Sequence, residues 1–419
     1  MINLDESKCD KKNKTIIDKK QCNSYSIIKK IFSSKNIKLL IDSENISTEA
    51  FFNHTAQQNL INDESSDNSN DTRNVLNKQT INIWKFLKLI NARLQYISSG
   101  STGHFFKGTI LNENKMVICN FAMKVSAYQK RKEYGSIYNL TRPENTELVM
   151  IRALSYFVVT KQTPHLILPI KTFYSDIEPF LKLIKGNLIN DNKGRYKDFI
   201  DRYEKGKYEN TVSVLFSELA SHGDFLDFIK NNFKVFNLTT WKVFFFQILS
   251  VLAIIQSKYP SFRHNDMKAN NILVTQVQHN ALRAEYTICN KKYIIPNIGF
   301  IIKLWDFDFA CISDVIGNKK VEEEWTKKIN ITSNQNRYYD IHYFFNTLIH
   351  RGFFPEILTN RTYIDKEVEE FIKRVIPTTY RVSPTANDKG RLMIDVEYTT
   401  PKNILESDSF FNDFREKNN

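Results

Sequence analysis

The chain has 419 residues, of which 42% are hydrophobic, and it carries a formal charge of +13 at pH 7. This length predicts two or three folding units, and the scarcity of Gly and Pro excludes fibrous and collagen-like classes. The positive charge favours anionic partners such as a nucleotide, an acidic protein or an acidic membrane surface, although abundant surface lysine is its commoner cause. No basic run carries a specific nucleic-acid motif.

The five cysteines are odd in number and scattered along the chain, without a CxxC pair. We therefore expect no disulfide framework and no zinc site, but an intracellular reducing compartment. The first ten residues are polar and charged, so no signal peptide is expected. The most apolar stretch, Trp241 to Gln256, is interrupted by polar residues, and we interpret it as a buried helix that is too short to span a bilayer.

Residues 1–80 are interpreted as an N-terminal extension that is partly disordered. The run from Asn62 to Asn77 is almost wholly polar, so it has too little apolar surface to offset its ordering entropy and predicts a solvated linker. Before this linker we expect weak helices at best. From Ile81 the apolar pattern tightens, and Ile83 to Ile90 have helical spacing.

The order of the next elements predicts the fold class. We expect strands at 93–97, 105–111, 116–125, 166–173 and 212–219, and helices at 146–157, 224–231 and 241–258. A charged stretch at about 182–210 is interpreted as an inserted loop. Strands with one helix, followed by mainly helices, predict a bilobal α+β fold. Its N-lobe would span 81–220 with an antiparallel sheet, and its C-lobe 221–419.

The strongest chemical signal is the run RHNDMKANN from Arg263 to Asn271, which lies between a buried helix and the strand Ile272–Val274. Phosphoryl transfer needs positioning and charge neutralisation rather than covalent chemistry from the protein. Asp266 supplies a carboxylate for the acceptor hydroxyl, Lys268 a cation for the phosphoryl oxygens, and Asn271 an oxygen ligand for magnesium. The alternative interpretation is a polar loop that caps a helix.

Three further segments complete this pattern. Asp306 ends the apolar strand in IIKLWDFDFA, where a carboxylate can bridge magnesium to two phosphates. Gly100 and Gly103 lie in SSGSTGHFF, where small residues let backbone amides approach phosphates, although alone this is an ordinary hairpin turn. Lys124 follows in FAMK, placed to bind the α- and β-phosphates, and Glu147 on the next helix could pair with it.

The order of these segments resembles the eukaryotic-type protein kinases over residues 93–375. FAMK resembles the family's V-A-I-K strand, HND replaces H-R-D, and DFD replaces D-F-G. The resemblance implies ATP as cosubstrate and Mg²⁺ as metal, with Mn²⁺ as an alternative. It further implies that backbone of Glu218 and Leu219 meets adenine and that Asp224 holds the ribose. Asp340, in YYDIH, would brace the catalytic loop from beneath.

Within that resemblance His264 has a structural role. A narrower likeness is to the poxvirus virion-assembly serine/threonine kinases and their relatives in giant DNA viruses, carried by DFDF, by NRYYDIHYFF and by the Phe410–Phe414 ending. It implies a viral kinase that phosphorylates Ser or Thr on proteins, among them virion structural proteins. It also implies a location in the virion and in the host cytoplasm or at assembly membranes.

The chain departs from the family at several places. Ser98 stands where the first glycine of G-x-G-x-x-G is usual, no A-P-E follows the activation segment, and an extended hairpin is expected at about 275–300. Asp308 replaces a glycine, so a positive φ would be strained there. Asn265 replaces a basic residue, which predicts activity that does not depend on phosphorylation of the activation segment.

Two other functions remain open from the sequence. A small-molecule kinase of the choline or aminoglycoside phosphotransferase type shares the HND run, but Lys268 is typical of serine/threonine protein kinases. A pseudokinase that acts as a binding scaffold is the other alternative, and it conflicts with the presence of every essential residue type.

Overall fold

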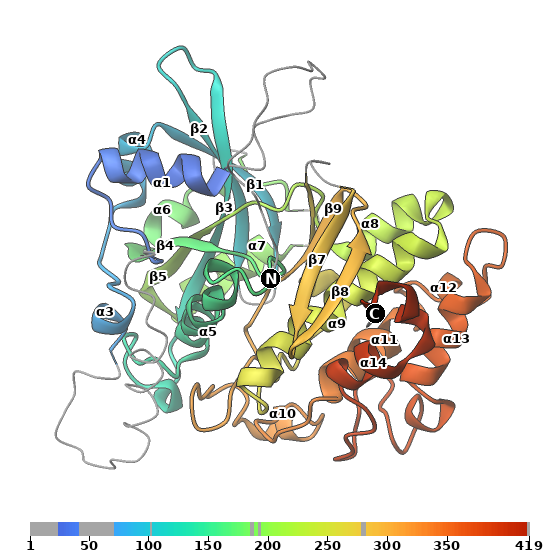
Figure 1. Ribbon diagram of the computed structural model, residues 1–419. Coiled ribbons are helices and arrows are strands. Elements are labelled where there is room, and N and C mark those ends of the chain that lie inside the picture. Colours follow the sequence, from blue (N-terminus) through green and yellow to red (C-terminus); the bar gives the residue numbers. More distant parts are fainter. Residues whose placement is uncertain are drawn as a thin grey trace. The chain divides into compact units, whose positions relative to one another are not determined.

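The structure is a computed structural model, and it describes residues 24–41, 71–100, 103–184, 188–191, 194–277 and 282–416. The described chain divides into two compact units, which are considered separately (Figure 1). The N-terminal unit holds residues up to Ser155 together with Ile167–Leu219. The C-terminal unit holds Tyr156–Leu166 and the chain from Ala220 onward.

The N-terminal unit contains a five-stranded antiparallel sheet in the order β1-β2-β3-β5-β4. Its strands are β1 (Ala92–Ser99), β2 (His104–Leu111), β3 (Val117–Gln129), β4 (Pro169–Asp176) and β5 (Tyr208–Ser217). The helix α5 (Pro143–Val159) lies between β3 and β4 in the sequence. The pairing places Lys124 of β3 opposite Phe105 of β2 and Leu215 of β5, so Lys124 lies on an inner strand of the sheet.

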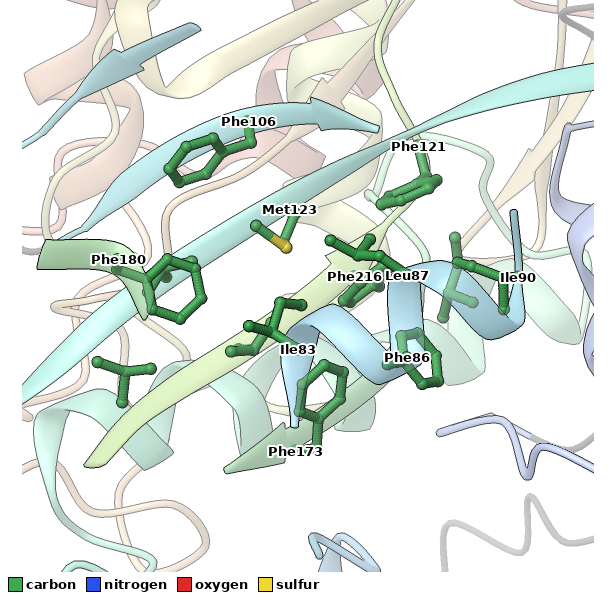
Figure 2. Packing of buried hydrophobic residues seen from close by; sticks show 14 of the residues in the cluster. Ile83, Phe86, Leu87, Ile90, Phe106, Phe121, Met123, Phe173, Phe180 and Phe216 are labelled. Carbon is green, nitrogen blue, oxygen red and sulfur yellow. The ribbon is translucent and has the colours of Figure 1, made fainter. Parts of the chain in front are cut away.

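The core of this unit is built from aromatic and branched side chains of the sheet and of α4 (Ile83–Leu89). The side chain of Asn82 accepts a hydrogen bond from the Lys85 amide, which caps the start of α4. Helical spacing then turns one apolar face of α4 inward. Figure 2 shows this face packed against strand residues of the cluster: Phe106, Phe121, Met123, Phe173 and Phe216.

Two segments of the expected N-terminal extension belong to this same unit. Helix α1 (Ser24–Ser34) buries Ile28 and Phe32 in the core cluster, and the Phe32 ring meets Phe86 edge-on with 5.9 Å between ring centroids. The chain from Asp71, including α3 (Thr72–Val75), packs on the unit as well. The expected boundary at residue 81 is therefore wrong for residues 24–41 and 71–80. Composition alone does not reveal that the rest of the unit offers a surface on which these segments pack. The polar run 62–70 lies outside the described residues.

The stretch at 182–210, expected as an inserted loop, contains a helix. After α6 (Glu178–Leu181), helix α7 (Arg195–Glu204) buries Tyr196 and Phe199 in the core cluster. The expectation of a single helix beside the sheet is corrected in the same way. A highly charged helix such as α7 needs only one narrow apolar face, and the charges on its other faces conceal that face in the sequence.

The C-terminal unit is mainly helical. Its helices are α8 (Phe225–Asn232), α9 (Leu238–Lys258), α10 (Glu324–Lys327), α11 (Tyr339–Leu348), α12 (Glu356–Thr359), α13 (Lys366–Val375) and α14 (Pro401–Ser407). Two antiparallel pairs accompany them: β6 (Ile272–Gln276) with β9 (Phe300–Leu304), and β7 (Arg283–Ile288) with β8 (Lys291–Pro296). The β7–β8 hairpin lies within the expected 275–300, and the predicted α+β fold class is confirmed (Figure 1).

Helix α9 is the central helix of this unit. The side chain of Asn237 accepts from the Thr240 amide and caps its start. With 21 residues, α9 is long and apolar enough to cross a membrane, so the expectation that it is too short is wrong. However, 83% of its most apolar window is buried inside the protein, which is the environment of a core helix.

Candidate active site

In the N-terminal unit, the structure brings Lys124 and Glu147 together. The Lys124 ammonium lies 2.6 and 2.7 Å from the two carboxylate oxygens of Glu147. Both side chains are buried, with 3% and 6% of their surface exposed. Lys124 comes from β3 and Glu147 from the second turn of α5, so the pair fixes the helix against the sheet. A buried pair of this kind depends on close geometry, because each charge has lost its hydration.

The glycine-containing turn lies directly against Lys124. The Gly100 amide donates to the Gly103 carbonyl over 2.8 Å. A Cβ atom on Gly103 would lie 3.0 Å from Lys124 Cε and 3.1 Å from the Val125 carbonyl oxygen. Gly103 is therefore needed for the close approach of this backbone to the lysine. Residues 101 and 102 of the turn lie outside the described residues.

Helix α7 supports this same turn, which the sequence did not predict. The His104 ring packs 4.5 Å from both the Tyr196 and the Phe199 ring centroids. Burial lowers the pKa of His104 to about 4, so the ring is neutral near pH 7. Ser99 lies 2.7 Å from His104 Nδ1, and its carbonyl accepts from Arg195 over 3.2 Å. The aromatic pair Tyr196 and Phe199, at helical spacing, was the signal in the sequence.

Two residues predicted to contact the nucleotide, Glu218 and Asp224, form hydrogen bonds within the protein. The Glu218 amide donates to the Leu168 carbonyl over 3.0 Å, and the Leu168 amide donates to the Glu218 side chain over 2.8 Å. The Glu218 amide is therefore engaged within the protein, and the contact of Glu218 with adenine stays a prediction. In the C-terminal unit, Asp224 caps α8 by accepting from the Asp227 amide over 2.9 Å. The roles of Leu219 and Asp224 toward ATP stay predictions.

The run from Arg263 to Asn271, which we call the catalytic loop, is bonded through its backbone to Asp340 of α11. Its carboxylate accepts from the His264 amide over 2.7 Å and from the Asn265 amide over 2.9 Å. All three residues are fully buried, and burial raises the pKa of Asp340. Asn265 has a φ of 62°, a left-handed conformation that asparagine tolerates. His264 Nε2 also bonds the Trp305 carbonyl over 2.9 Å, which ties the loop to the end of β9.

Asp266 lies at the centre of this loop. One carboxylate oxygen accepts from Lys268 over 2.8 Å and from the Asn271 side-chain amide over 2.9 Å. The other oxygen accepts from Arg391 over 2.6 Å. Burial would raise the pKa of Asp266, but Lys268 and Arg391 outweigh it and hold that pKa below its usual value. Asp266 is therefore ionised near neutral pH and fixed in one orientation.

Arg391 is a site residue that the sequence did not reveal. It follows the turn at Gly390, where φ is 80°, and only 7% of its side chain is exposed. Its Nη1 donates to the Asn265 carbonyl and, over 3.2 Å, to the Tyr339 hydroxyl. Its guanidinium lies 4.1 Å from the ring centroid of Tyr343. A single arginine in a polar turn carries no motif, so nothing in the local sequence pointed to this role.

The two predicted metal ligands, Asn271 and Asp306, lie at the same end of the β6–β9 pair. Ile272 pairs with Leu304, and the Trp305 amide donates to the Asn271 carbonyl over 3.2 Å. Asn271 thus precedes β6 just where Asp306 follows β9. The Asn271 amide nitrogen is engaged by Asp266, so its oxygen is the atom left for a cation. Asp306, not Asp308, adopts the left-handed conformation, with a φ of 62°.

This pair of oxygen ligands fits Mg²⁺ or Mn²⁺ bound together with phosphate and water. Within the residues that the structure describes, no group of three or more His, Cys, Asp or Glu side chains is arranged to hold a metal ion. A magnesium ion here would therefore take most of its ligands from nucleotide and solvent, which is its usual coordination in phosphoryl-transfer enzymes.

The activation segment, which is the chain between Ala310 and Asp340, is tied to the rest of the site by side-chain contacts. Asp308 forms an ion pair with Lys320, and both side chains are largely buried. Arg263, two residues before Asn265, is a buried cation that donates to the Thr332 hydroxyl over 2.8 Å and to the Asn330 carbonyl over 2.7 Å. The loop therefore contains a buried cation, Arg263, two positions before Asn265. Asn265 itself stands where the family usually has an arginine.

The profile of the family described as poxvirus serine/threonine protein kinase matches residues 112–383. A protein of Acanthamoeba polyphaga mimivirus, named for serine/threonine-protein kinase activity, is 43% identical over 400 residues, which cover 94% of this chain and 80% of that protein.

Poxvirus proteins match over shorter stretches. The serine/threonine-protein kinase 2 of fowlpox virus is 24% identical over 269 residues, covering 59% of this chain and 55% of that protein. The protein of the same name from monkeypox virus is 30% identical over 206 residues, covering 48% and 41%.

Proposed function

The chain belongs to the poxvirus serine/threonine protein kinase family, and from that premise we propose how its own residues transfer the ATP γ-phosphate to a protein hydroxyl. It is a viral serine/threonine protein kinase that uses ATP. The observation that carries the residue assignment is Asp266, ionised and held between Lys268, Asn271 and Arg391.

Asp266 is the group that receives the acceptor hydroxyl. Its carboxylate orients the hydroxyl oxygen toward the γ-phosphorus and takes the proton as the new P–O bond forms. The bond between the γ-phosphorus and the β–γ bridging oxygen breaks, and ADP leaves. Lys268, already beside the carboxylate, supplies positive charge next to the transferring group. Because Asp340 fixes the loop backbone, Asp266 needs little reorganisation during the reaction.

The phosphates of ATP are bound by charged side chains and by backbone amides. Lys124, fixed by Glu147, binds the α- and β-phosphates, and the turn with Gly100 and Gly103 lies over them. Asn271 and Asp306 would hold Mg²⁺, for which Mn²⁺ could substitute. When bound, the metal neutralises charge on the β- and γ-phosphates.

The substrates are proteins, and we assign virion structural proteins among them from the likeness to virion-assembly kinases. The chain would then act in the host cytoplasm and be carried in the virion. Its charge of +13 favours an acidic membrane surface at assembly sites.

The test is a kinase assay with Mg-ATP and a generic protein acceptor, comparing the wild type with Asp266→Asn. We expect kcat to fall on the order of a hundredfold or more with ATP affinity nearly kept, because a positioned base is lost. Asp413→Asn is the matched control, since Asp413 is 81% exposed. Asp306→Asn should weaken magnesium binding as well.

The assay also separates the alternatives. Phosphoamino-acid analysis should find phosphoserine or phosphothreonine on the acceptor protein. Turnover only with small alcohols would identify a small-molecule kinase, and no turnover with either acceptor would identify a scaffold. Wild-type activity in Asp266→Asn would show that the catalytic assignment is wrong.

A further inference from the structure

Lys78 is a fully buried lysine in the N-terminal unit, with 1% of its surface exposed. Its amine donates to Tyr128 over 2.7 Å, to Ser213 over 2.8 Å and to Asn145 over 3.3 Å. It also lies 4.3 Å from the ring centroid of Tyr174. Lysine is almost never fully buried unless it is paired, and these three partners are neutral oxygens. Burial of the Lys78 amine among neutral partners therefore costs stability, which suggests that the residue has a further role.

The partners of Lys78 come from the same two elements that the Lys124–Glu147 pair joins. The Tyr128 hydroxyl of β3 donates to the Asn145 side chain of α5 over 2.7 Å. Tyr128 and Lys124 both come from β3 and both contact α5, Tyr128 through Asn145 and Lys124 through Glu147. Asn145 precedes Glu147 by two residues. Lys78 thus completes a second connection between β3 and α5, parallel to the ion pair.

The segment before Lys78 contacts α5 again beyond Glu147. Arg152, five residues after Glu147, donates to the Val75 carbonyl over 2.8 Å. At its other end the segment is anchored by Thr72, which is buried and whose amide donates to the Tyr138 carbonyl over 2.9 Å. Residues 71–78 therefore bond to α5 at positions on both sides of Glu147.

We propose that residues 71–78 are a positioning element that holds α5 so that Glu147 reaches Lys124. This rests on the proposed function of that pair in binding the ATP phosphates. The ion pair is buried and tolerates little displacement, and a misplacement of about 1 Å at a phosphate-binding group can cost on the order of a hundredfold in rate. Lys78 is a positioning residue, because it acts on ATP through Glu147 and Lys124.

The test is a double-mutant cycle in the full-length chain with Lys78→Met, Glu147→Gln and the two combined. The readout is kcat/KM for Mg-ATP, at a temperature where circular dichroism shows every variant folded. We expect Lys78→Met to lower kcat/KM by about tenfold or more, and the double variant to match Glu147→Gln alone, because both changes act on one interaction. Lys85→Met is the matched control, since Lys85 is exposed on α4.

Each outcome decides a different point. Wild-type kcat/KM in Lys78→Met, or two losses that multiply in the double variant, would overturn the positioning role. If Glu147→Gln itself keeps wild-type activity, the proposed function of the ion pair fails instead. Should Lys78→Met not fold, Arg152→Met replaces it in the cycle, because it removes the hydrogen bond between α5 and the Val75 carbonyl. A smaller loss with the same non-additivity is then expected.

Discussion

Arg391 donates to the carboxylate of Asp266 over 2.6 Å, although 125 positions separate the two residues. Both side chains are buried, with 7% and 10% of their surface exposed. The other guanidinium nitrogen donates to the carbonyl of Asn265, the residue before Asp266. One arginine therefore fixes both the side chain and the backbone of the proposed catalytic residue.

We predict that Arg391→Met lowers kcat by about tenfold or more while ATP affinity is nearly kept. Removing Arg391 leaves Lys268 as the remaining cationic partner of the buried Asp266 carboxylate. The loss therefore falls partly on stability, but below the roughly 3–5 kcal/mol of a buried charge left with no partner. Arg391→Lys should restore part of the activity, because it keeps the charge but not the forked geometry. The measurement is steady-state kinetics beside thermal unfolding.

Arg374→Met is the control for this prediction, since Arg374 forms a more exposed pair with Asp408. A kcat in Arg391→Met equal to that of the wild type would show that Asp266 needs no help from Arg391.

Activity should not depend on phosphorylation of the activation segment. The buried cation Arg263 already bonds the Thr332 hydroxyl and the Asn330 carbonyl, and the Asn265 side chain bonds the Thr332 carbonyl over 3.0 Å. We expect purified enzyme treated with phosphatase to keep its initial rate within about twofold once the phosphatase is removed. A tenfold drop that recovers when Thr332 or Ser333 is rephosphorylated would contradict this.

The buried Lys78 should make stability depend on pH. Burial lowers the pKa of Lys78 in the folded protein well below the usual 10.5. At pH values between the folded-state pKa and 10.5, the unfolded chain therefore binds more protons than the folded protein. Stability therefore rises with pH across this window, by up to about 1.4 kcal/mol per pH unit from this group. Denaturant unfolding of wild type and Lys78→Met from pH 7.5 to 9.5 measures the difference in slope. Equal slopes would mean that Lys78 keeps its ordinary pKa.

Limited proteolysis should leave residues 71–80 attached to the N-terminal unit. The sequence predicted a solvated linker from Asn62 to Asn77 and a tighter apolar pattern only from Ile81, but Thr72, Leu76 and Lys78 are buried. Trypsin should therefore spare the bond after Lys78 in the folded protein and cut it after unfolding, as read by mass spectrometry. A stable core that begins at residue 79 and still binds ATP would refute both this protection and the need for 71–78.

The class of the fold and the residues proposed for the catalytic loop could both be predicted from the sequence. Asp266, Lys268 and Asn271 lie within six consecutive residues, so local backbone geometry suffices to bring them together. The antiparallel strands and the apolar helix α9 could be read from periodicity because each signal is local. The structure also brings Lys124 and Glu147 together, as predicted from their elements.

The distant residues that support this loop could be identified only from the contacts in the folded protein. Arg391 beside Asp266, Lys78 beside Asn145, and α7 against the glycine turn each join segments that are far apart in the sequence. A lone arginine, a lone lysine or a charged helix is ordinary surface composition until a specific neighbour buries it. Such contacts form only when complete helices and strands pack together. The free energy of that packing comes from the whole core, so the local sequence around each contact does not reveal it.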